Sequence, residues 1–541
     1  MFLIKRYNII ISFILLGWAF CSANVAAQQT DSAWRDMDYL RNNNAWLSSG
    51  NVLGLQYFSV NKISNAKAYF NKSDGKFINY YQSDNSYTVG ASTESFYRLN
   101  PNVVFQGKVV YENFSGKNMG GSAFINPYAQ PLDIDENADS TTGPKKLERY
   151  NLLGAGSAKV SRKWTLGGKI NYEAANYAKI KDLRHINKLL NMDVEAGVSY
   201  ALDNTVEIGV SYDYIRRIES IVFNMDGNTD KQYLSLINYG SFFGQKELFA
   251  GSGSSSGYTL QTNPMVNNTH RFSLLANIHI NPQVELFNDF SYGIRNGYFG
   301  EKGTISIVFT EHNSKQFGYN GILSLKHYHS LHNFNIKANY ESLKNMQNVY
   351  REETDAGGTT SIVYYGQNQL LDQKITNAAI GYTGYFGIKN DNPLWTLSAG
   401  GNYYRREQTT TLYPFYREEI INSYMFDIFA DRNFIRDKNM YSISLGFDYG
   451  SGSGTPKDDG TYTTPSSSQT APATRDNYLY EEYEYFTKPR VKSGLGVKYS
   501  RIINAQFTGF LQLNFAYTKA FDVSYLGNNF RSVNFTVGCT F

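Results

Sequence analysis

The chain is poor in cysteine, proline and charge. Its 541 residues include 2 cysteines and 12 prolines, and only 18% are Asp, Glu, Lys or Arg, whereas about a quarter is usual. Cys21 lies in an N-terminal apolar segment, so a processed chain keeps only Cys539, which excludes an intramolecular disulfide. The net charge of +4 does not indicate a nucleic-acid binder.

Long hydrophobic runs are also missing. No stretch reaches the roughly eighteen consecutive apolar residues that indicate a transmembrane helix. The apolar run Ile9–Phe20 follows Lys5 and Arg6 and precedes the small residues Val25–Ala27. These are the parts of a secretory signal peptide, so we expect residues 1–27 to be removed.

Aromatic residues are abundant instead, at 16% of the chain, with 44 Tyr and 35 Phe. From about Val52 onward, apolar and polar residues alternate. Trp164 and Ile170 fall on one face of such a run, and Lys169 and Glu173 fall on the other. A period of two with one apolar face predicts a strand between two different solvents. The same alternation recurs over 190–200, 206–214, 334–341 and 441–449.

The length of these runs separates a membrane barrel from a soluble sandwich. They extend for about ten to fourteen residues, whereas soluble strands average about five or six and a tilted membrane strand needs about nine to eleven. Tight turns alternate with long connections, which is the pattern of an outer-membrane barrel with periplasmic turns. The long connections are 115–148, 219–269, 351–372 and 451–489.

We therefore predict an all-β fold over residues 52–541, a transmembrane antiparallel outer-membrane β-barrel with about 18 strands and 16 as the alternative count. The C-terminal residue Phe541 shares a strand face with Cys539, Val537 and Phe535. This pattern resembles the C-terminal signal that barrel-assembly machinery reads. It predicts that machinery and outer-membrane lipids as partners, and the cell outer membrane as the location.

A barrel of this size is too wide for its own side chains to fill, so the polar strand faces predict a lumen. Because the inward candidates carry both signs, we expect no strong ion selectivity. A hydrated lumen that passes polar solutes and a lumen closed by salt bridges, loops and the N-terminus both remain open. The lumen-facing candidates are Lys169, Asn171, Glu173, Asp193, Glu195, Glu207, Asp213, Asn335 and Lys337.

Residues 28–51 form a separate N-terminal segment, either periplasmic or lumenal. The segment is too short and too poor in glycine to be the plug domain of a TonB-dependent receptor, but Trp34, Trp46 and Leu47 give it an apolar side that could fill part of the lumen. Asn43-Asn44-Ala45 resembles, without its proline, the Asn-Pro-Ala segment of hydrophobic-solute uptake barrels.

Two patterns could hold a metal ion. Asp133–Asp139 has the spacing of a calcium loop, but Ala138 and Pro144 stand where such a loop has Gly and Glu, so an acidic, solvated loop is expected. His327 and His329 could chelate a metal from one strand face. Their parity points outward at the periplasmic rim, so an interfacial girdle is expected and no metal site.

The densest aromatic run is Tyr478–Phe486. It predicts either an extracellular ligand surface or a strand that extends beyond the membrane with its aromatic belt. The tyrosines of the first interpretation are Tyr478, Tyr480, Tyr483 and Tyr485. No nucleophile elbow, phosphate loop or zinc signature is present, so we expect neither an enzyme nor a cofactor.

The chain resembles a family of uncharacterised outer-membrane β-barrels from Bacteroidota. Asn43–Trp46, the loop Ala123–Asp133, the tyrosine-rich strands and the terminal Phe541 carry this resemblance. It implies the barrel fold and an outer-membrane location over nearly the whole mature chain. It also implies work beside TonB-dependent uptake systems, with a surface lipoprotein or a TonB-dependent receptor as partner.

Three functions follow from these observations. The first is a porin-like, passive transport or binding barrel for a small polar solute. The second is a non-conducting accessory barrel whose long loops dock a surface lipoprotein or TonB-dependent receptor. The third is a hydrophobic-solute channel, which needs an apolar lumen and a lateral opening. What residues 28–51 and the long loops do inside the barrel distinguishes them.

Overall fold

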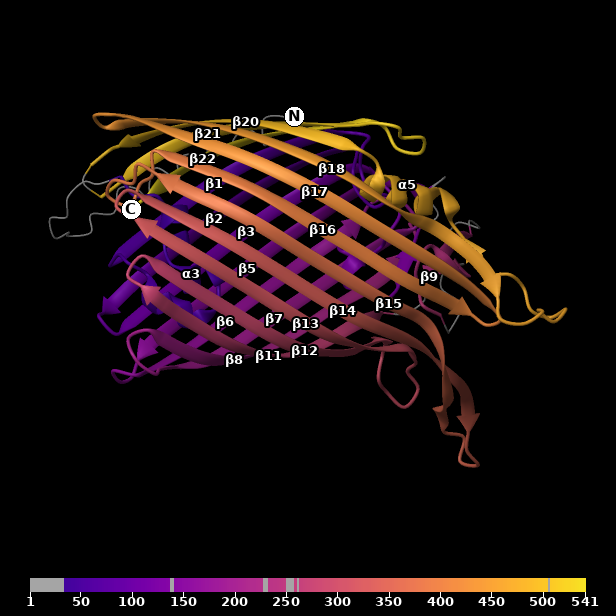
Figure 1. The fold of residues 1–541 in the computed structure, drawn as a ribbon. Coiled ribbons are helices and arrows are strands. Elements are labelled where there is room, and N and C mark those ends of the chain that lie inside the picture. Colours follow the sequence, from indigo (N-terminus) through magenta and orange to yellow (C-terminus); the bar gives the residue numbers. More distant parts are fainter. Residues whose placement is uncertain (1–33, 137–140, 227–231, 250–256, 260–261, 505) are drawn as a thin grey trace.

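Eighteen antiparallel strands form one closed sheet in the computed structural model (Figure 1). The sheet closes because β1 (Lys62–Gly75) pairs with β22 (Asn529–Thr540), where Phe70 lies opposite Phe535. The predicted outer-membrane β-barrel of 18 strands is confirmed. The structure describes residues 34–541 except 137–140, 227–231, 250–256, 260–261 and 505, so the predicted signal peptide lies outside the described residues.

The other strands follow one another around the barrel in chain order. They are β2 (Asn85–Asn100), β3 (Val103–Met119), β5 (Gly143–Lys159), β6 (Trp164–Lys179), β7 (Arg184–Ala201), β8 (Val206–Asn224), β11 (Asn263–Asn281), β12 (Val284–Gly300), β13 (Val308–His327), β14 (Ser330–Thr354), β15 (Thr360–Phe386), β16 (Trp395–Leu412), β17 (Phe415–Arg436), β18 (Asn439–Thr461), β20 (Arg490–Ile502) and β21 (Thr508–Ala520).

The alternating sequence pattern gives the wall its two faces. On β11, Phe272 and Leu274 are 59% and 58% exposed on the outer face, whereas the neighbouring Leu275 is fully buried on the inner one. Closure pairs the strand edges, so the wall leaves no open sheet edge to lipid. Among the described residues, no helix is long and apolar enough to cross a membrane.

The two ends of the barrel differ. At one end, called here the short-turn end, connections such as 101–102 and 437–438 are tight. β1 begins and β22 ends at this same end. At the opposite, long-loop end the β14–β15 hairpin projects well past the barrel (Figure 1). The expected loop over 351–372 is therefore wrong, because the two strands stay paired until only 355–359 remain as a turn.

The N-terminal segment lies inside the short-turn end and continues to residue 61. It contains the helices α2 (Met37–Asn42) and α3 (Ala45–Ser49) and the 3-10 helix η1 (Val52–Tyr57). We expected a strand from about residue 52, but the first strand begins at Lys62. Helices of this length are not stable alone, so packing against the wall must hold them.

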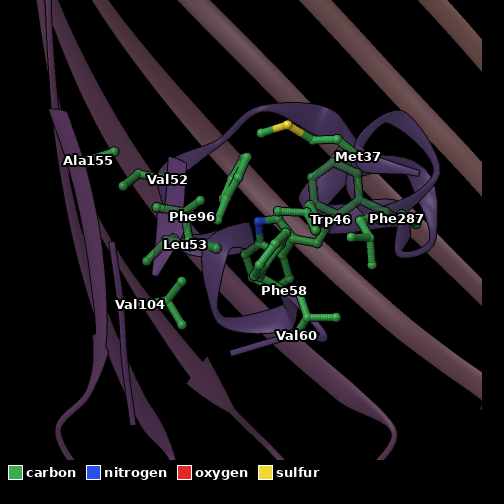
Figure 2. Packing of buried hydrophobic residues seen from close by; sticks show 14 of the residues in the cluster. Met37, Trp46, Val52, Leu53, Phe58, Val60, Phe96, Val104, Ala155 and Phe287 are labelled. Carbon is green, nitrogen blue, oxygen red and sulfur yellow. The ribbon is translucent and has the colours of Figure 1, made fainter. Parts of the chain in front are cut away.

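An apolar cluster provides that packing. Trp46 and Phe58 are almost fully buried, and Phe96, Val104 and Phe287 of the wall pack around them (Figure 2). Phe58 stacks on Phe96 with a centroid distance of 4.5 Å. The burial of these side chains seats the segment against the inner wall.

Glycines on the inner face of the wall make room for the segment. A Cβ atom at Gly167 would lie 2.8 Å from Val52, and one at Gly197 would lie 3.1 Å from Leu53. Such a contact at Gly167 is closer than real Cβ atoms approach their neighbours. The absence of side chains at these two positions of β6 and β7 therefore lets the 3-10 helix pack closely against the wall.

A second body fills the long-loop end and is called here the cap. Its four-stranded sheet contains β4 (Asp133–Asp135), β9 (Tyr233–Asn238), β10 (Phe243–Phe249) and β19 (Ala473–Thr474). The 3-10 helix η2 (Pro127–Ala129) and the helix α5 (Asp476–Thr487) complete it. Ile134, Ile237 and Tyr239 are buried against Met265 and Phe299 of the wall. Long connections from different parts of the chain thus converge over one opening.

The expected strand over 478–486 is a helix, α5. Tyr478, Leu479 and Glu482 are buried together, at spacings of one and three that suit a helix face. The alternation of Tyr and Glu in this run imitates a strand period. The contacts that bury the helix face come from Tyr80 and Phe242, which are distant in sequence.

Candidate functional site

Carboxylates of the inner wall hold the N-terminal segment at the short-turn end. Glu285 of β12 is buried and accepts a hydrogen bond from Asn44 Nδ2 at 2.8 Å. Glu195 of β7 accepts from Asn51 Nδ2 at 2.7 Å and from the Val52 backbone N–H at 3.1 Å. Each contact joins a charged acceptor to a neutral donor, which is stronger than a neutral hydrogen bond.

The end of the segment is held in the same way. Tyr57 donates its hydroxyl hydrogen to Glu207 Oε2 at 2.5 Å. Arg98 of β2 donates to the backbone carbonyls of Gln56 and Phe58. At its start, the segment meets the β15–β16 connection, where Asp36 N–H donates to Asp391 O at 3.1 Å.

Several predicted lumen residues therefore contact the segment or its anchors. Lys169 forms an ion pair with Glu195, and Asp213 lies opposite Glu195 on the next strand. Asn335 and Lys337 continue the face of Asn333, whose side chain donates to Asn42 O at 2.8 Å.

The remaining candidates lie elsewhere on the inner wall. Glu173 pairs with Arg149 at 3.0 Å, Asn171 accepts from Asn151 at 2.9 Å, and Asp193 lies opposite Asn171. Sequence reasoning missed Glu285 and Arg98. Glu285 could have been found from the alternation along β12, because it falls on the opposite strand face from the outward Phe290.

Buried ion pairs fasten the cap to the wall. Glu136 accepts from Lys145 at 2.6 Å and pairs with Lys179, and all three side chains are at most 1% exposed. His185 Nε2 lies 3.1 Å from the same carboxylate. Burial alone would raise the pKa of Glu136, but the two ammonium groups outweigh it and hold the pKa well below its usual range.

Helix α5 is anchored by a second buried group of charges. Arg406 Nη2 contacts Glu482 at 2.6 Å and Glu419 at 2.7 Å. Tyr128 of η2 donates to Glu482 Oε1 at 2.7 Å. Because removing one partner of a buried pair leaves an uncompensated charge, the cap is firmly joined to the barrel.

The expected acidic, solvated loop at Asp133–Asp139 is wrong for its first part. Asp133 and Asp135 are buried in β4, where Tyr80 donates to Asp133 Oδ2 at 2.9 Å. Burial, and then the neighbouring charge of Asp133, raise the pKa of Asp135 well above its usual value. Asn137 and Asp139 lie outside the described residues.

The predicted histidine cluster lies at the short-turn end, where β13 ends at His327 and β14 begins at Ser330. His332 Nδ1 lies 2.9 Å from the Tyr382 hydroxyl, and Tyr328 and His329 pack edge to face. Within the described ranges, no group of three or more His, Cys, Asp or Glu residues could hold a metal ion.

The tyrosines of the predicted ligand surface point in different directions around α5. Tyr478 is buried in the cap, so it is not available on a surface. Tyr480 stacks on Tyr525 at 4.8 Å, and Tyr483 donates to Gly454 O at 2.8 Å. Tyr485 stacks on Phe77 at 5.5 Å and lines a cavity.

That cavity, called here the chamber, has a volume of about 580 Å³. Its lining combines the β1–β2 connection, α5 and the inner face of the wall on both sides of the β1–β22 seam. Arg149, Arg490 and Lys492 face it with Asp448. Its aromatic lining includes Phe77, Tyr81, Phe114, Tyr177, Tyr485 and Phe530. The size falls within the range of small-molecule pockets, about 300–1,000 Å³.

Residues 52–541 match the model described as "Family of unknown function (DUF6850)", and the chain belongs to this family. No curated protein sequence matches it.

Two solved structures are similar in fold. The ferric preacinetobactin receptor BauA of Acinetobacter baumannii is 9% identical, with 89% of this chain and 79% of that chain covered and a TM-score of 0.41. The toluene transporter TodX of Pseudomonas putida is 9% identical, with 94% and 95% covered and a TM-score of 0.29. At these identities the likeness does not extend beyond the barrel fold.

Replacing Glu195 by Ala is expected to loosen the N-terminal segment. The change removes the acceptor for Asn51 and Val52, and a hydrogen bond to a charged group contributes about 1.5–3 kcal/mol. Amide hydrogen exchange over residues 44–57 should accelerate while the barrel strands stay protected. Glu341→Ala is the matched control, since Glu341 is an inner-wall carboxylate that pairs with Arg295 at 2.9 Å. Equal exchange in both variants would show that Glu195 does not hold the N-terminal segment.

Replacing Asp135 by Asn is expected to remove a pH dependence of the cap. Because the folded-state pKa of Asp135 is raised, the neutral acid favours the folded cap, and that contribution is lost as the pH rises through the folded value. Proteolysis of the 120–136 loop should therefore increase in the wild type as the pH is raised above the ordinary range of an Asp carboxyl, and it should change less in the variant. The same pH response in both proteins would argue against this role.

Proposed function

We propose that this member of the family is an outer-membrane barrel that binds and admits a small solute, and that residues 34–61 are its periplasmic plug. The single observation that carries the proposal is the seat of this segment, in which charged acceptors of the wall hold neutral donors of the plug. The short-turn end would face the periplasm.

The contacts between the plug and the wall carboxylates support a plug that can move out of the lumen. Asn44, Asn51 and Tyr57 are neutral, and water can replace each of their hydrogen bonds once the segment moves. The wall carboxylates would then face an aqueous lumen. Lys169 already pairs with Glu195, so that carboxylate keeps a counter-charge in an open barrel.

The cap supports the other half of the proposal. It carries the chamber at the opposite end and is fixed by ion pairs such as Glu136 with Lys145. A rigid binding region and a releasable plug suit a barrel that holds a solute before admitting it. We propose no catalytic step, and the Bacteroidota origin stays a prediction.

A second candidate function is the non-conducting accessory barrel. The projecting β14–β15 hairpin favours it, because the hairpin extends past the wall and exposes Tyr364 and Tyr365. Its partner would be a surface lipoprotein or a TonB-dependent receptor. The third candidate, a hydrophobic-solute channel, has less support because charged pairs such as Arg149 with Glu173 line the lumen.

Conductance in planar bilayers tests the proposal. The mature protein is expected to be closed or nearly so, and a form without residues 28–60 is expected to conduct steadily, because the short-turn end then lacks its apolar and hydrogen-bonded filling. Heat-modifiable migration on gels checks that both forms are folded barrels. A truncated barrel that is folded and still closed would contradict solute admission and favour the accessory function, because the cap alone would then close the lumen.

A further inference from the structure

We infer that the chamber binds an aromatic carboxylate, with Arg490 as the anchor for its negative charge. The inference deepens the proposed function and rests on it for the idea that the chamber holds a solute. It follows from the charge balance of the chamber, from the position of one guanidinium group and from the rings that surround it.

The cations of the chamber differ in their partners. Arg149 lies between Glu173 at 3.0 Å and Glu112 at 3.6 Å. Lys492 pairs with Asp448 at 2.8 Å. Within the part of the chain that the structure describes, Arg490 forms no ion pair.

Arg490 is positioned so that half of its guanidinium stays available. Its Nη1 donates to Phe486 O at 3.2 Å and to Lys488 O at 3.4 Å, at the end of α5. Its Nε and Nη2 donate to no described residue. A Cβ atom at Gly450 would lie 3.0 Å from Nε and 3.1 Å from Nη2, so the glycine leaves room for the group beside β18.

A half-buried cation without a counter-charge favours an anion beside it. Carboxylate matches the Nε and Nη2 edge of a guanidinium in two parallel hydrogen bonds, which gives both strength and direction. Lys492 follows on the same strand face and adds a second positive charge, although Asp448 already offsets it.

The lining specifies the rest of the ligand. Tyr485, Tyr81 and Phe530 come from different elements and line the same cavity. Met425 is 37% exposed at the chamber and supplies a flexible thioether, which contacts aromatic rings favourably. A flat ring that carries a carboxylate would combine aromatic contacts with the pairing to Arg490.

Isothermal titration calorimetry of the full mature protein in detergent tests the inference. The probes are 4-hydroxybenzoate, its neutral analogue 4-hydroxybenzamide and the non-aromatic cyclohexanecarboxylate. We expect 4-hydroxybenzoate to bind at least tenfold more tightly than either analogue. Raising KCl from 0.1 to 1 M should weaken only the binding of the anions.

The variants locate the site. Arg490→Gln is expected to weaken 4-hydroxybenzoate binding at least tenfold and to leave the weak binding of the amide unchanged. Lys498→Gln is the matched control, because Lys498 lies on the same strand and face as Arg490 but outside the chamber. Arg490→Lys keeps the charge without the paired donors and should give intermediate affinity. Heat-modifiable migration shows whether each variant is folded.

Specific outcomes would overturn the inference. Equal affinity for the acid and the amide would remove the role of charge, and equal affinity for the two carboxylates would remove the role of the ring. Absence of binding by every probe would reject the ligand class, even if the truncated barrel conducts. Binding to a protein whose truncated form stays closed would instead reject the uptake role and keep the site.

Discussion

The width of the lumen is the constraint on which the rest of this structure depends. A closed sheet of eighteen strands leaves a space that its own side chains cannot fill. The outer face is apolar and suits lipid, so the inner face is left to polar residues and to whatever chain or water occupies the space. The protein fills the two ends of that space with segments that differ in chemistry.

The N-terminal segment has an apolar core and is held to the wall by polar contacts. Trp46 and Phe58 supply its core, and Glu195, Glu207 and Glu285 accept hydrogen bonds from its neutral groups. The cap instead contains buried ion pairs, and breaking such a pair from one side costs about 3–5 kcal/mol. The cap also arises from connections that continue into strands at both of their ends, whereas the described part of the plug continues into a strand at β1. The plug is therefore the body that is better suited to move.

Much of the wall could be predicted from sequence because each strand repeats one simple pattern. The alternation at Trp164–Ala174 records lipid on one side and a polar lumen on the other, and it needs no tertiary information. The bodies inside the lumen could not be predicted in this way. Tyr478–Phe486 alternates like a strand yet forms a helix, because its partners Tyr80 and Phe242 come from distant loops.

The candidate site also combines features that local sequence alternation predicts with features that depend on distant contacts. Glu195 and Glu207 could be assigned to the polar strand face from parity alone, but their task of holding the plug depends on contacts with Asn51 and Tyr57, which are more than a hundred positions away. The sequence around Asp133 and Asp135 predicts a solvated loop, because no local pattern indicates their pairing with the distant strand β9, beside which both side chains are buried. The chamber depends on both kinds of information, since strands and α5 line it together.

Distance measurement by pulsed electron spin resonance tests whether the wall carboxylates hold a movable plug. Spin labels at Ser48 and at Asp437, in a background with Cys539→Ser, report the position of α3 relative to the tight turn between β17 and β18. If these carboxylates hold a movable plug, we expect one narrow distance in the resting protein and a second, broader population when Glu195, Glu207 and Glu285 are all replaced by Gln. A single unchanged narrow distance in that variant, with the barrel folded, would contradict it.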